Sequence, residues 1–104
     1  MNKRLRKKKG LSKITEEELW GLDITLAKYI LPRLIKFKEI NTMGHPTDFD
    51  SQESWYKVMD KMIYSFQYVL EQNRGVYDGD LKAKEDKYQE GIQLFAKYFM
   101  DLWD

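Results

Sequence analysis

The chain contains no cysteine and a single histidine, His45, and both scarcities restrict its chemistry. Without cysteine it has no disulfides, Fe–S clusters, thiolate zinc sites or cysteine nucleophiles, which fits a reducing cytoplasm. One histidine, in the loop-like segment Gly44-His45-Pro46, excludes a metal centre that needs several histidine ligands. We therefore expect no bound metal and no cofactor.

Long apolar runs and catalytic motifs are also absent. No stretch approaches the roughly 20 apolar residues that span a bilayer. The basic N-terminus is followed by the polar, acidic residues 11–18 and not by the apolar segment that a secretory signal peptide needs. The P-loop, GxGxxG and HExxH motifs are missing, and Asp78-Gly79-Asp80 is better explained as a turn than as a calcium loop. These absences predict a soluble, cytoplasmic protein that is not an enzyme and does not bind membranes.

The charge is unevenly distributed along the 104 residues, which are enough for one domain. Residues 1–12 are predicted to be a disordered basic arm, and residues 13–104 a single helical domain whose net charge is acidic. The arm either follows the phosphate backbone of a nucleic acid or only solubilises the terminus. Its basic residues are Lys3, Arg4, Arg6, Lys7, Lys8 and Lys9.

Helical spacing dominates the rest of the chain, and no segment has the periodicity of a strand. Thr15 and Glu18 match a capping box, so a short N-terminal helix begins there and is interrupted at Gly21. Three longer helices follow. The predicted fold is all-α, a small bundle of three main helices preceded by a short one.

The first main helix, from about residue 24 to residue 40, contains Pro32 well beyond its first turn. A proline there removes a backbone hydrogen bond and crowds the preceding turn, so the helix should be kinked or divided near Leu31. Asp23 would fall on the apolar face if the helix began earlier, so it is predicted to be the N-cap. The alternative is a buried acid paired with a base.

The other two helices are marked by apolar periodicity and end signals. One begins at a cap, Asp50 or Ser51, and ends at Asn73-Arg74-Gly75. Its predicted core residues are Trp55, Met59, Met62, Phe66 and Val69. The last helix is predicted to run from about residue 81 to residue 102, with an apolar side formed by Leu81, Tyr88, Ile92, Phe95, Phe99 and Leu102.

A polar stripe on the first main helix is the best candidate for a ligand site. Arginine offers a planar fork for phosphate, lysine a mobile charge and tyrosine a face for a ring. These groups predict binding of a nucleotide or another phosphorylated ligand by Thr25, Lys28, Tyr29, Arg33, Lys36 and Lys61. The alternative is a solvated helix face whose long side chains cover apolar neighbours.

A second stripe combines basic and aromatic residues opposite the predicted core face of the next helix: Lys57, Lys61, Tyr64 and Tyr68. Such a pattern serves base stacking, but surface tyrosines also mark subunit interfaces. We favour an interface. The aromatic residues expected on the surface are Tyr64, Tyr68, Tyr98 and Trp103. Because so much exposed aromatic surface is typical of self-association, they predict a homo-oligomer.

The segment WGLDITLAKYILPRLIKFKE, residues 20–39, resembles the signature segment of an uncharacterised family of small phage- and prophage-encoded helical proteins. A second block, with Trp55, Asp60-Lys61-Met62-Ile63 and Phe66, resembles the family too, so that the resemblance covers about residues 20–66. It implies a phage or prophage protein in a bacterial cytoplasm and implies no reaction. The family pattern includes Trp20, Asp23, Thr25, Lys28, Pro32, Arg33, Lys36, Trp55, Asp60 and Lys61, and we assign structural roles to Trp20, Asp23, Pro32, Trp55 and Phe66.

Three hypotheses for function follow. The first is counter-defence capture of a nucleotide or another phosphorylated ligand by a homo-oligomer. The second is an inhibitor or adaptor that binds a host or phage protein through aromatic faces. The third is a nucleic-acid-binding accessory protein that uses the basic arm. All three act by stoichiometric binding.

Overall fold

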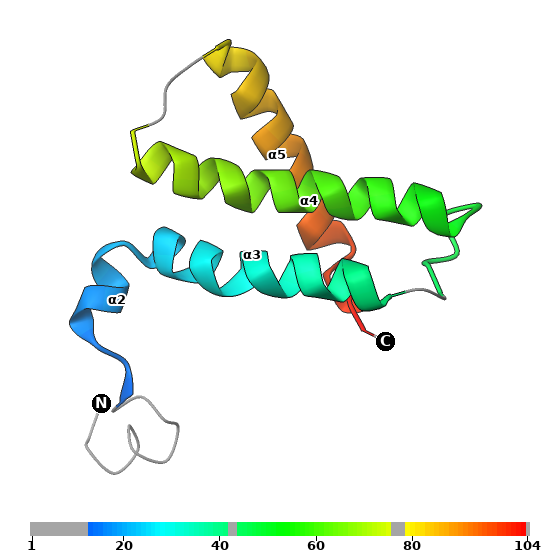
Figure 1. Cartoon of the computed structure of the whole chain (residues 1–104), viewed down its shortest axis with the longest axis horizontal. Coiled ribbons are helices and arrows are strands. Elements are labelled where there is room, and N and C mark those ends of the chain that lie inside the picture. Colours follow the sequence, from blue (N-terminus) through cyan, green and yellow to red (C-terminus); the bar gives the residue numbers. More distant parts are fainter. Residues whose placement is uncertain (1–12, 42–43, 76–78, 104) are drawn as a thin grey trace.

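The computed structural model describes residues 13–41, 44–75 and 79–103, and this part of the chain is helical without strands (Figure 1). The predicted basic arm lies outside the described residues. The elements in chain order are α2 (Glu16–Trp20), α3 (Leu22–Ile40), α4 (Gln52–Asn73), α5 (Leu81–Lys97) and the 3₁₀ helix η2 (Phe99–Asp101). The predicted class, a small all-α bundle of three main helices with a short one before them, is confirmed.

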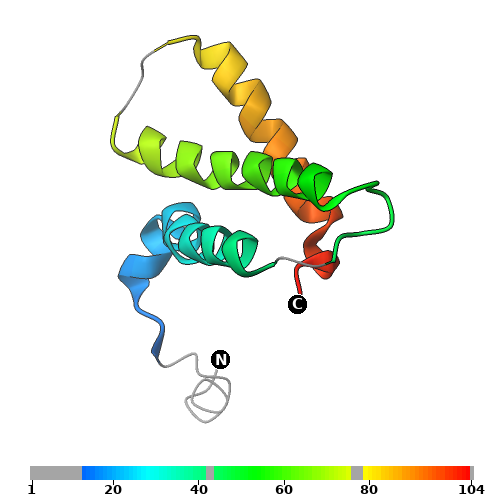
Figure 2. The ribbon, with the colours of Figure 1, turned by 45° about the vertical axis from the view of Figure 1, so that its right-hand side comes forward.

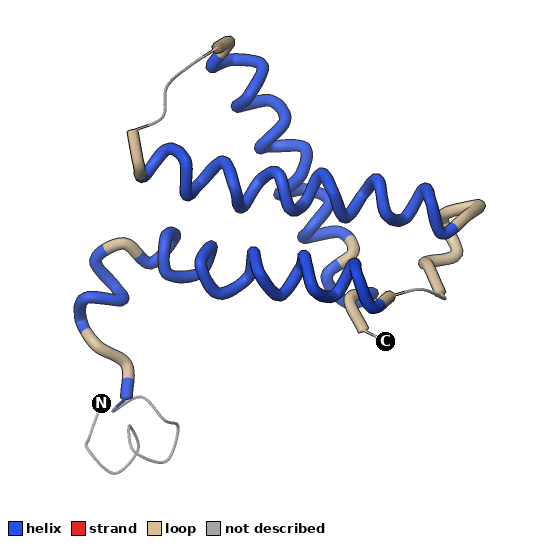
Figure 3. Tube along the Cα trace, viewed as in Figure 1, coloured by secondary structure: helices blue, strands red, loops and turns tan. Residues whose placement is uncertain are grey.

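Helix α4 is the centre of the bundle, because both α3 and α5 pack against it. Figures 1 and 2 show α3 running beside α4 in the opposite direction, while α5 crosses α4 steeply and ends near the C-terminal end of α3. The connections between the main helices lie at the ends of the bundle (Figure 3). The C-terminal segment of the chain is thereby placed against α3.

The hydrophobic core lies along the predicted apolar face of α4. Trp55, Met59, Met62 and Phe66 are buried there, and Val69 is partly buried, so this prediction is confirmed. The remaining buried apolar residues are Ala27, Leu34 and Tyr98. An aromatic cluster closes one end of the core, with centroid distances of 5.5 Å from Phe49 to Trp55, 5.1 Å from Phe49 to Tyr98 and 5.7 Å from Trp55 to Tyr98.

Asn41 is a buried polar residue that fastens the end of α3 to α4. Its backbone carbonyl accepts hydrogen bonds from the Tyr56 hydroxyl at 2.6 Å and from Gln52 Nε2 at 3.1 Å. Gln52 Nε2 also donates to Asn41 Oδ1 at 2.8 Å. These bonds satisfy polar groups that would be costly to bury unpaired, and they fix where α4 begins beside the last turn of α3.

The crossing of α4 and α5 is a close approach between two helix backbones at Gly91. A Cβ atom added to Gly91 would overlap both Ser65 Oγ and the backbone carbonyl oxygen of Lys61. Ser65 is itself fully buried, and its hydroxyl donates to the carbonyl of Tyr88 on α5 at 2.8 Å. The small residues therefore set the distance between the helices, and a hydrogen bond sets their register.

The helix caps follow the sequence closely. Thr15 Oγ1 accepts from the Glu18 N–H at 3.3 Å, and Glu18 Oε2 accepts from the Thr15 N–H at 2.8 Å, which confirms the capping box. Ser51 caps α4, and Gly75 beyond its C-terminal end has a φ of 77°. Asp80 caps α5. Local side-chain chemistry thus defines where three of these helices begin.

Asp23 is neither an N-cap nor a buried acid, and both predictions for it are wrong. Helix α3 begins two residues earlier than predicted, with Gly21 at the N-cap, and the exposed Asp23 carboxylate accepts from the Ile24 N–H at 2.9 Å. The first buried residue of α3 is Ala27, so the first turn lies beyond the core. A carboxylate there is stabilised by the positive end of the helix dipole.

Two predicted helix boundaries are also corrected. Helix α3 continues through Pro32, so the division near Leu31 is wrong. Pro32 is exposed on the outer face, where water can solvate a carbonyl that loses its helical partner. The last helix ends at Lys97 rather than at residue 102, because Tyr98 turns into the core and η2 follows.

We predict that Gly91→Ala lowers the free energy of unfolding by about 1–3 kcal/mol, because the added methyl group forces α4 and α5 apart. On helix propensity alone the same change would stabilise the protein by about 1 kcal/mol, so the two effects have opposite signs. Urea unfolding measures the difference.

Gly21→Ala is the matched control for Gly91→Ala. A Cβ atom at Gly21 would lie 3.8 Å from the Ile24 side chain, which is an ordinary contact. Because alanine is less favourable than glycine at an N-cap, its free energy of unfolding should fall, but by less than about 1 kcal/mol. An unchanged or increased stability of Gly91→Ala would contradict the close crossing.

Candidate functional site

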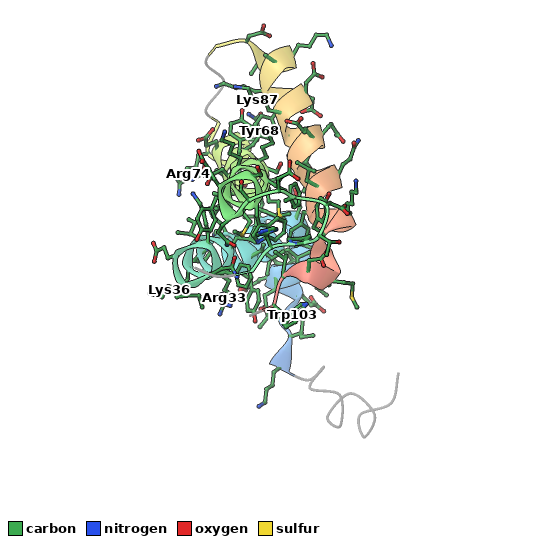
Figure 4. All side chains as sticks on the ribbon, turned by 90° about the vertical axis from the view of Figure 1, so that its right-hand side faces the viewer. Arg33, Lys36, Tyr68, Arg74, Lys87 and Trp103 are labelled. Atoms are coloured by element: carbon green, nitrogen blue, oxygen red, sulfur yellow. The ribbon has the colours of Figure 1, made fainter. Side chains whose placement is uncertain are left out.

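The residues predicted to bind a ligand are only partly brought together. Thr25, Lys28, Tyr29, Arg33 and Lys36 lie along α3, and all but the half-buried Thr25 are exposed. Lys61 lies on α4 and forms an ion pair of 3.4 Å with Glu90 of α5. Figure 4 shows Arg33 and Lys36 on one side of the molecule and Tyr68 and Lys87 on the opposite side.

Arg33 is folded back along its own helix. Its Nη1 donates to the carbonyl of Tyr29 at 2.8 Å, and the centre of its guanidinium lies 3.6 Å from the Tyr29 ring centroid. The N–H that Pro32 lacks would have bonded to the carbonyl of Lys28, so the bond to Tyr29 does not replace it, although it folds the guanidinium onto the turn beside the proline. The planar fork that suggested a phosphate site is thus engaged in stabilising α3.

Other members of the polar stripe also have partners within the chain. The Thr25 hydroxyl donates to the Glu18 carbonyl at 2.9 Å and joins α2 to α3. Lys36 lies 3.8 Å from the Glu39 carboxylate, in an exposed ion pair. An exposed pair of this kind contributes little stability and releases its lysine easily. The prediction that these residues bind a phosphorylated ligand stays a prediction.

The stripe of basic and aromatic residues on α4 faces α5 rather than open solvent. Tyr68 donates to Glu85 at 2.9 Å and lies 5.2 Å, centroid to centroid, from Tyr88. Tyr64 stacks on Tyr68 with a centroid distance of 6.4 Å. Both rings are half-buried, so α5 covers much of the surface that suggested a subunit interface.

Three further aromatic predictions have different outcomes. Tyr98 was expected on the surface but is 6% exposed in the core, where its hydroxyl donates to Asp48 at 3.1 Å. Trp103 is exposed as expected. Trp20, which was given a structural role, is 79% exposed at the end of α2 and does not belong to the core.

An apolar groove that the sequence did not indicate lies between α3 and the C-terminal part of the chain. It has a volume of about 260 Å³ and is bordered by the two stripe residues Tyr29 and Arg33. The apolar side chains that line it are Ile30, Leu34, Phe37, Phe95 and Leu102. We call it the α3–α5 groove. The predicted apolar side of the last helix supplies Phe95 and Leu102, but only the fold reveals that they face α3.

The C-terminal part of the chain carries exposed apolar side chains, of which Phe99 lies beside the α3–α5 groove and Trp103 lines a different pocket with Trp55. Phe99 packs edge-on against Phe95 at a centroid distance of 5.5 Å and is still 57% exposed. Met100 is 83% exposed, and Trp103 is 74% exposed. Large apolar residues gathered around a groove are typical of a surface that binds another polypeptide.

A second pocket of about 260 Å³ between α4 and α5 is polar, and it is lined by Asp60, Lys61, Tyr64, Lys87 and Glu90. Two lysines and two carboxylates balance its charge. Lys61 is paired with Glu90, and Asp60 is paired with Lys38 at 2.6 Å. With Lys38 counted, three lysines face two carboxylates, and the third ammonium, that of Lys87, lies 5.8 Å from the Tyr64 ring centroid.

Within residues 13–41, 44–75 and 79–103, no group of three or more histidine or carboxylate side chains is placed to hold a metal ion. In the same part of the chain, no helix combines the length and the apolar character needed to cross a bilayer.

The hydrogen bond to Glu85 changes the acidity of Tyr68. The Glu85 carboxylate accepts a hydrogen bond from the Tyr68 hydroxyl, which stabilises the protonated phenol. Together with partial burial, this hydrogen bond raises the pKa of Tyr68 above its ordinary value of 10.0. The folded-state pKa of Tyr68 is higher than its unfolded-state pKa. The hydrogen bond therefore contributes fully to the free energy of unfolding below about pH 10, and this contribution is lost as the pH rises through the folded-state pKa.

Comparisons with protein-family models, with curated proteins and with solved structures find no significant match. The proposal for function therefore depends on the geometry of the described residues.

We predict that Tyr68→Phe makes stability less dependent on pH in the alkaline range, roughly pH 9 to 11, because the Phe variant has no phenol to titrate there. Thermal unfolding at a series of pH values measures the effect. Tyr64→Phe is the matched control, since it keeps the Tyr68–Glu85 hydrogen bond and should lose stability as the wild type does. Identical alkaline profiles for Tyr68→Phe and the wild type would rule out this coupling.

Proposed function

We propose that this chain is a non-enzymatic binding protein that acts by stoichiometric capture of another polypeptide, accepting an amphipathic helix of that partner into the α3–α5 groove. The main support for this proposal is that the groove is open and apolar, with Ile30, Phe37 and Leu102 on its walls. The predicted anion-binding group Arg33 is meanwhile engaged with the carbonyl and the ring of Tyr29.

The groove suits a helix because its lining comes from successive turns of α3. Ile30, Leu34 and Phe37 are spaced by four and three residues, so together they form a wall along the helix axis. Apolar anchors at similar spacing on a partner helix would fill the space between this wall and Phe95. The exposed side chain of Phe99, which packs on Phe95, extends the contact beyond the groove.

Capture of a small phosphorylated ligand has less support. Arg33 would have to leave both the Tyr29 carbonyl and the Tyr29 ring before it could hold a phosphate. Lys61 would contribute from a different face, where Glu90 already neutralises it. In the setting that the phage resemblance implies, the partner is a host or phage protein of the bacterial cytoplasm.

The proposal predicts that Ile30→Glu and Leu102→Glu each weaken partner binding at least tenfold, because a carboxylate in the groove loses hydration without a charge to pair with. Tenfold corresponds to about 1.4 kcal/mol. The partner is first identified by crosslinking and mass spectrometry in the bacterial host, and the affinity of the purified pair is then measured by calorimetry. Circular dichroism checks that both variants are folded.

Two controls separate the groove from the polar stripe. Ile35→Glu changes a partly exposed apolar residue of α3 that does not line the groove, and it should bind normally. The double variant Lys28→Ala/Lys36→Ala should also bind normally. A co-purified phosphorylated molecule that this double variant loses, with no polypeptide captured by the wild type, would overturn the proposal.

A further inference from the structure

The outer face of α3 carries a row of exposed side chains at alternating steps of four and three residues. These six residues, which we call the outer row, are Leu22, Leu26, Tyr29, Arg33, Lys36 and Ile40. A step of four followed by a step of three repeats every seven residues, which is the pattern by which the side chains of two helices interlock in a coiled coil. The buried residues of α3, Ala27 and Leu34, do not belong to the row.

The apolar members of the outer row have no adequate cover in a single chain. Leu22 is 46% exposed, Leu26 48%, Tyr29 60% and Ile40 52%. Helix α4 packs against the side of α3 that carries Ala27, so it cannot cover them. A line of partly exposed large side chains at this spacing indicates an interface rather than scattered surface residues.

We propose that two copies of this chain pair antiparallel through the outer row, about a two-fold axis that passes the helix at the level of Leu31. The sequence positions of the row are symmetric about residue 31. Leu22 therefore faces Ile40 of the second copy, Leu26 faces Lys36, and Tyr29 faces Arg33. Such a row is its own complement, which is the requirement for a two-fold interface.

Each of the three contacts is chemically favourable. Leu22 and Ile40 exclude water from each other at both ends of the interface. Arg33 already stacks on its own Tyr29 at 3.6 Å, and in the pair it can also contact the Tyr29 ring of the second copy. The alkyl stem of Lys36 covers Leu26 of the second copy while its ammonium stays in water.

Charge favours the antiparallel direction. The chain before this surface is acidic, with three glutamates at residues 16–18, whereas the row itself carries Arg33 and Lys36 in its C-terminal half. Antiparallel pairing brings the acidic end of one copy to the basic end of the other. In-register parallel pairing would instead place Arg33 against Arg33 and Lys36 against Lys36, which is repulsive.

Helix α2 gives an independent reason for a second copy. It has five residues, none of them buried, and leaves Leu19 55% and Trp20 79% exposed. A helix this short is not stable alone. Figure 1 shows α2 projecting from the N-terminal end of α3 and away from α4. In the antiparallel pair it lies near the C-terminal end of the second α3, where Ile40 is exposed.

Sedimentation equilibrium tests the pairing, and we expect a mass of twice 12.6 kDa. Leu26→Lys sets an ammonium against Lys36 of the second copy and should weaken the dimer at least tenfold. Adding Lys36→Glu to this variant turns the repulsion into an ion pair and should restore the dimer. Ile35→Lys is the matched control outside the row and should leave the dimer intact.

Disulfide crosslinking tests the direction, because the natural chain has no cysteine. An equimolar mixture of Leu22→Cys with Ile40→Cys should give a disulfide-linked heterodimer, and Leu22→Cys alone should not crosslink efficiently. The opposite result would establish parallel pairing, and a monomer at all concentrations would refute the interface. Leu102→Glu changes only the α3–α5 groove and should remain dimeric. This variant therefore distinguishes a failure of the proposed dimer from a failure of the proposed binding at the groove.

Discussion

The contact between Ser65 on α4 and Gly91 on α5 is the constraint on which the rest of the structure depends. Because the two backbones touch there, α5 crosses α4 at one place and in one register, fixed by the hydrogen bond from Ser65 to Tyr88. That crossing directs the C-terminal end of α5 toward α3. The groove between Phe37 and Phe95 exists only because α5 arrives in this direction.

The polar residues of α3 are explained by the helix itself before any ligand is considered. Arg33, the residue after the proline in the middle of α3, folds back and bonds to the Tyr29 carbonyl. Thr25 similarly holds α2 in place through Glu18. The exposed surface of α3 includes the large apolar side chains of Leu22, Leu26 and Ile40 among its charged residues, and for this reason polypeptide surfaces are better candidates for contact with it than small anions.

Local patterns in the sequence were sufficient for the fold class, for the capping residue Thr15 and for the core of α4 from Trp55 to Phe66, and they narrowed the cap of α4 to Asp50 or Ser51. Contacts between distant segments were not predictable in this way. Ser65 and Gly91 look like surface residues in polar helices, because a close crossing has no periodicity of its own. Tyr98 was assigned to the surface because a helical pattern was extended past Lys97, where the helix ends. The α3–α5 groove needs two helices whose approach only the fold defines.

The three tryptophans of the chain occupy three distinct surroundings, and each gives its own optical signal. Trp55 is enclosed by Phe49 and Tyr98, so its fluorescence reports whether the end of the core is closed. Trp103 is open to solvent beyond η2, and Trp20 is open to solvent at the end of α2. Emission from these two indoles responds to anything that covers either end of the α3 surface, while the emission of Trp55 stays constant as long as the bundle is folded.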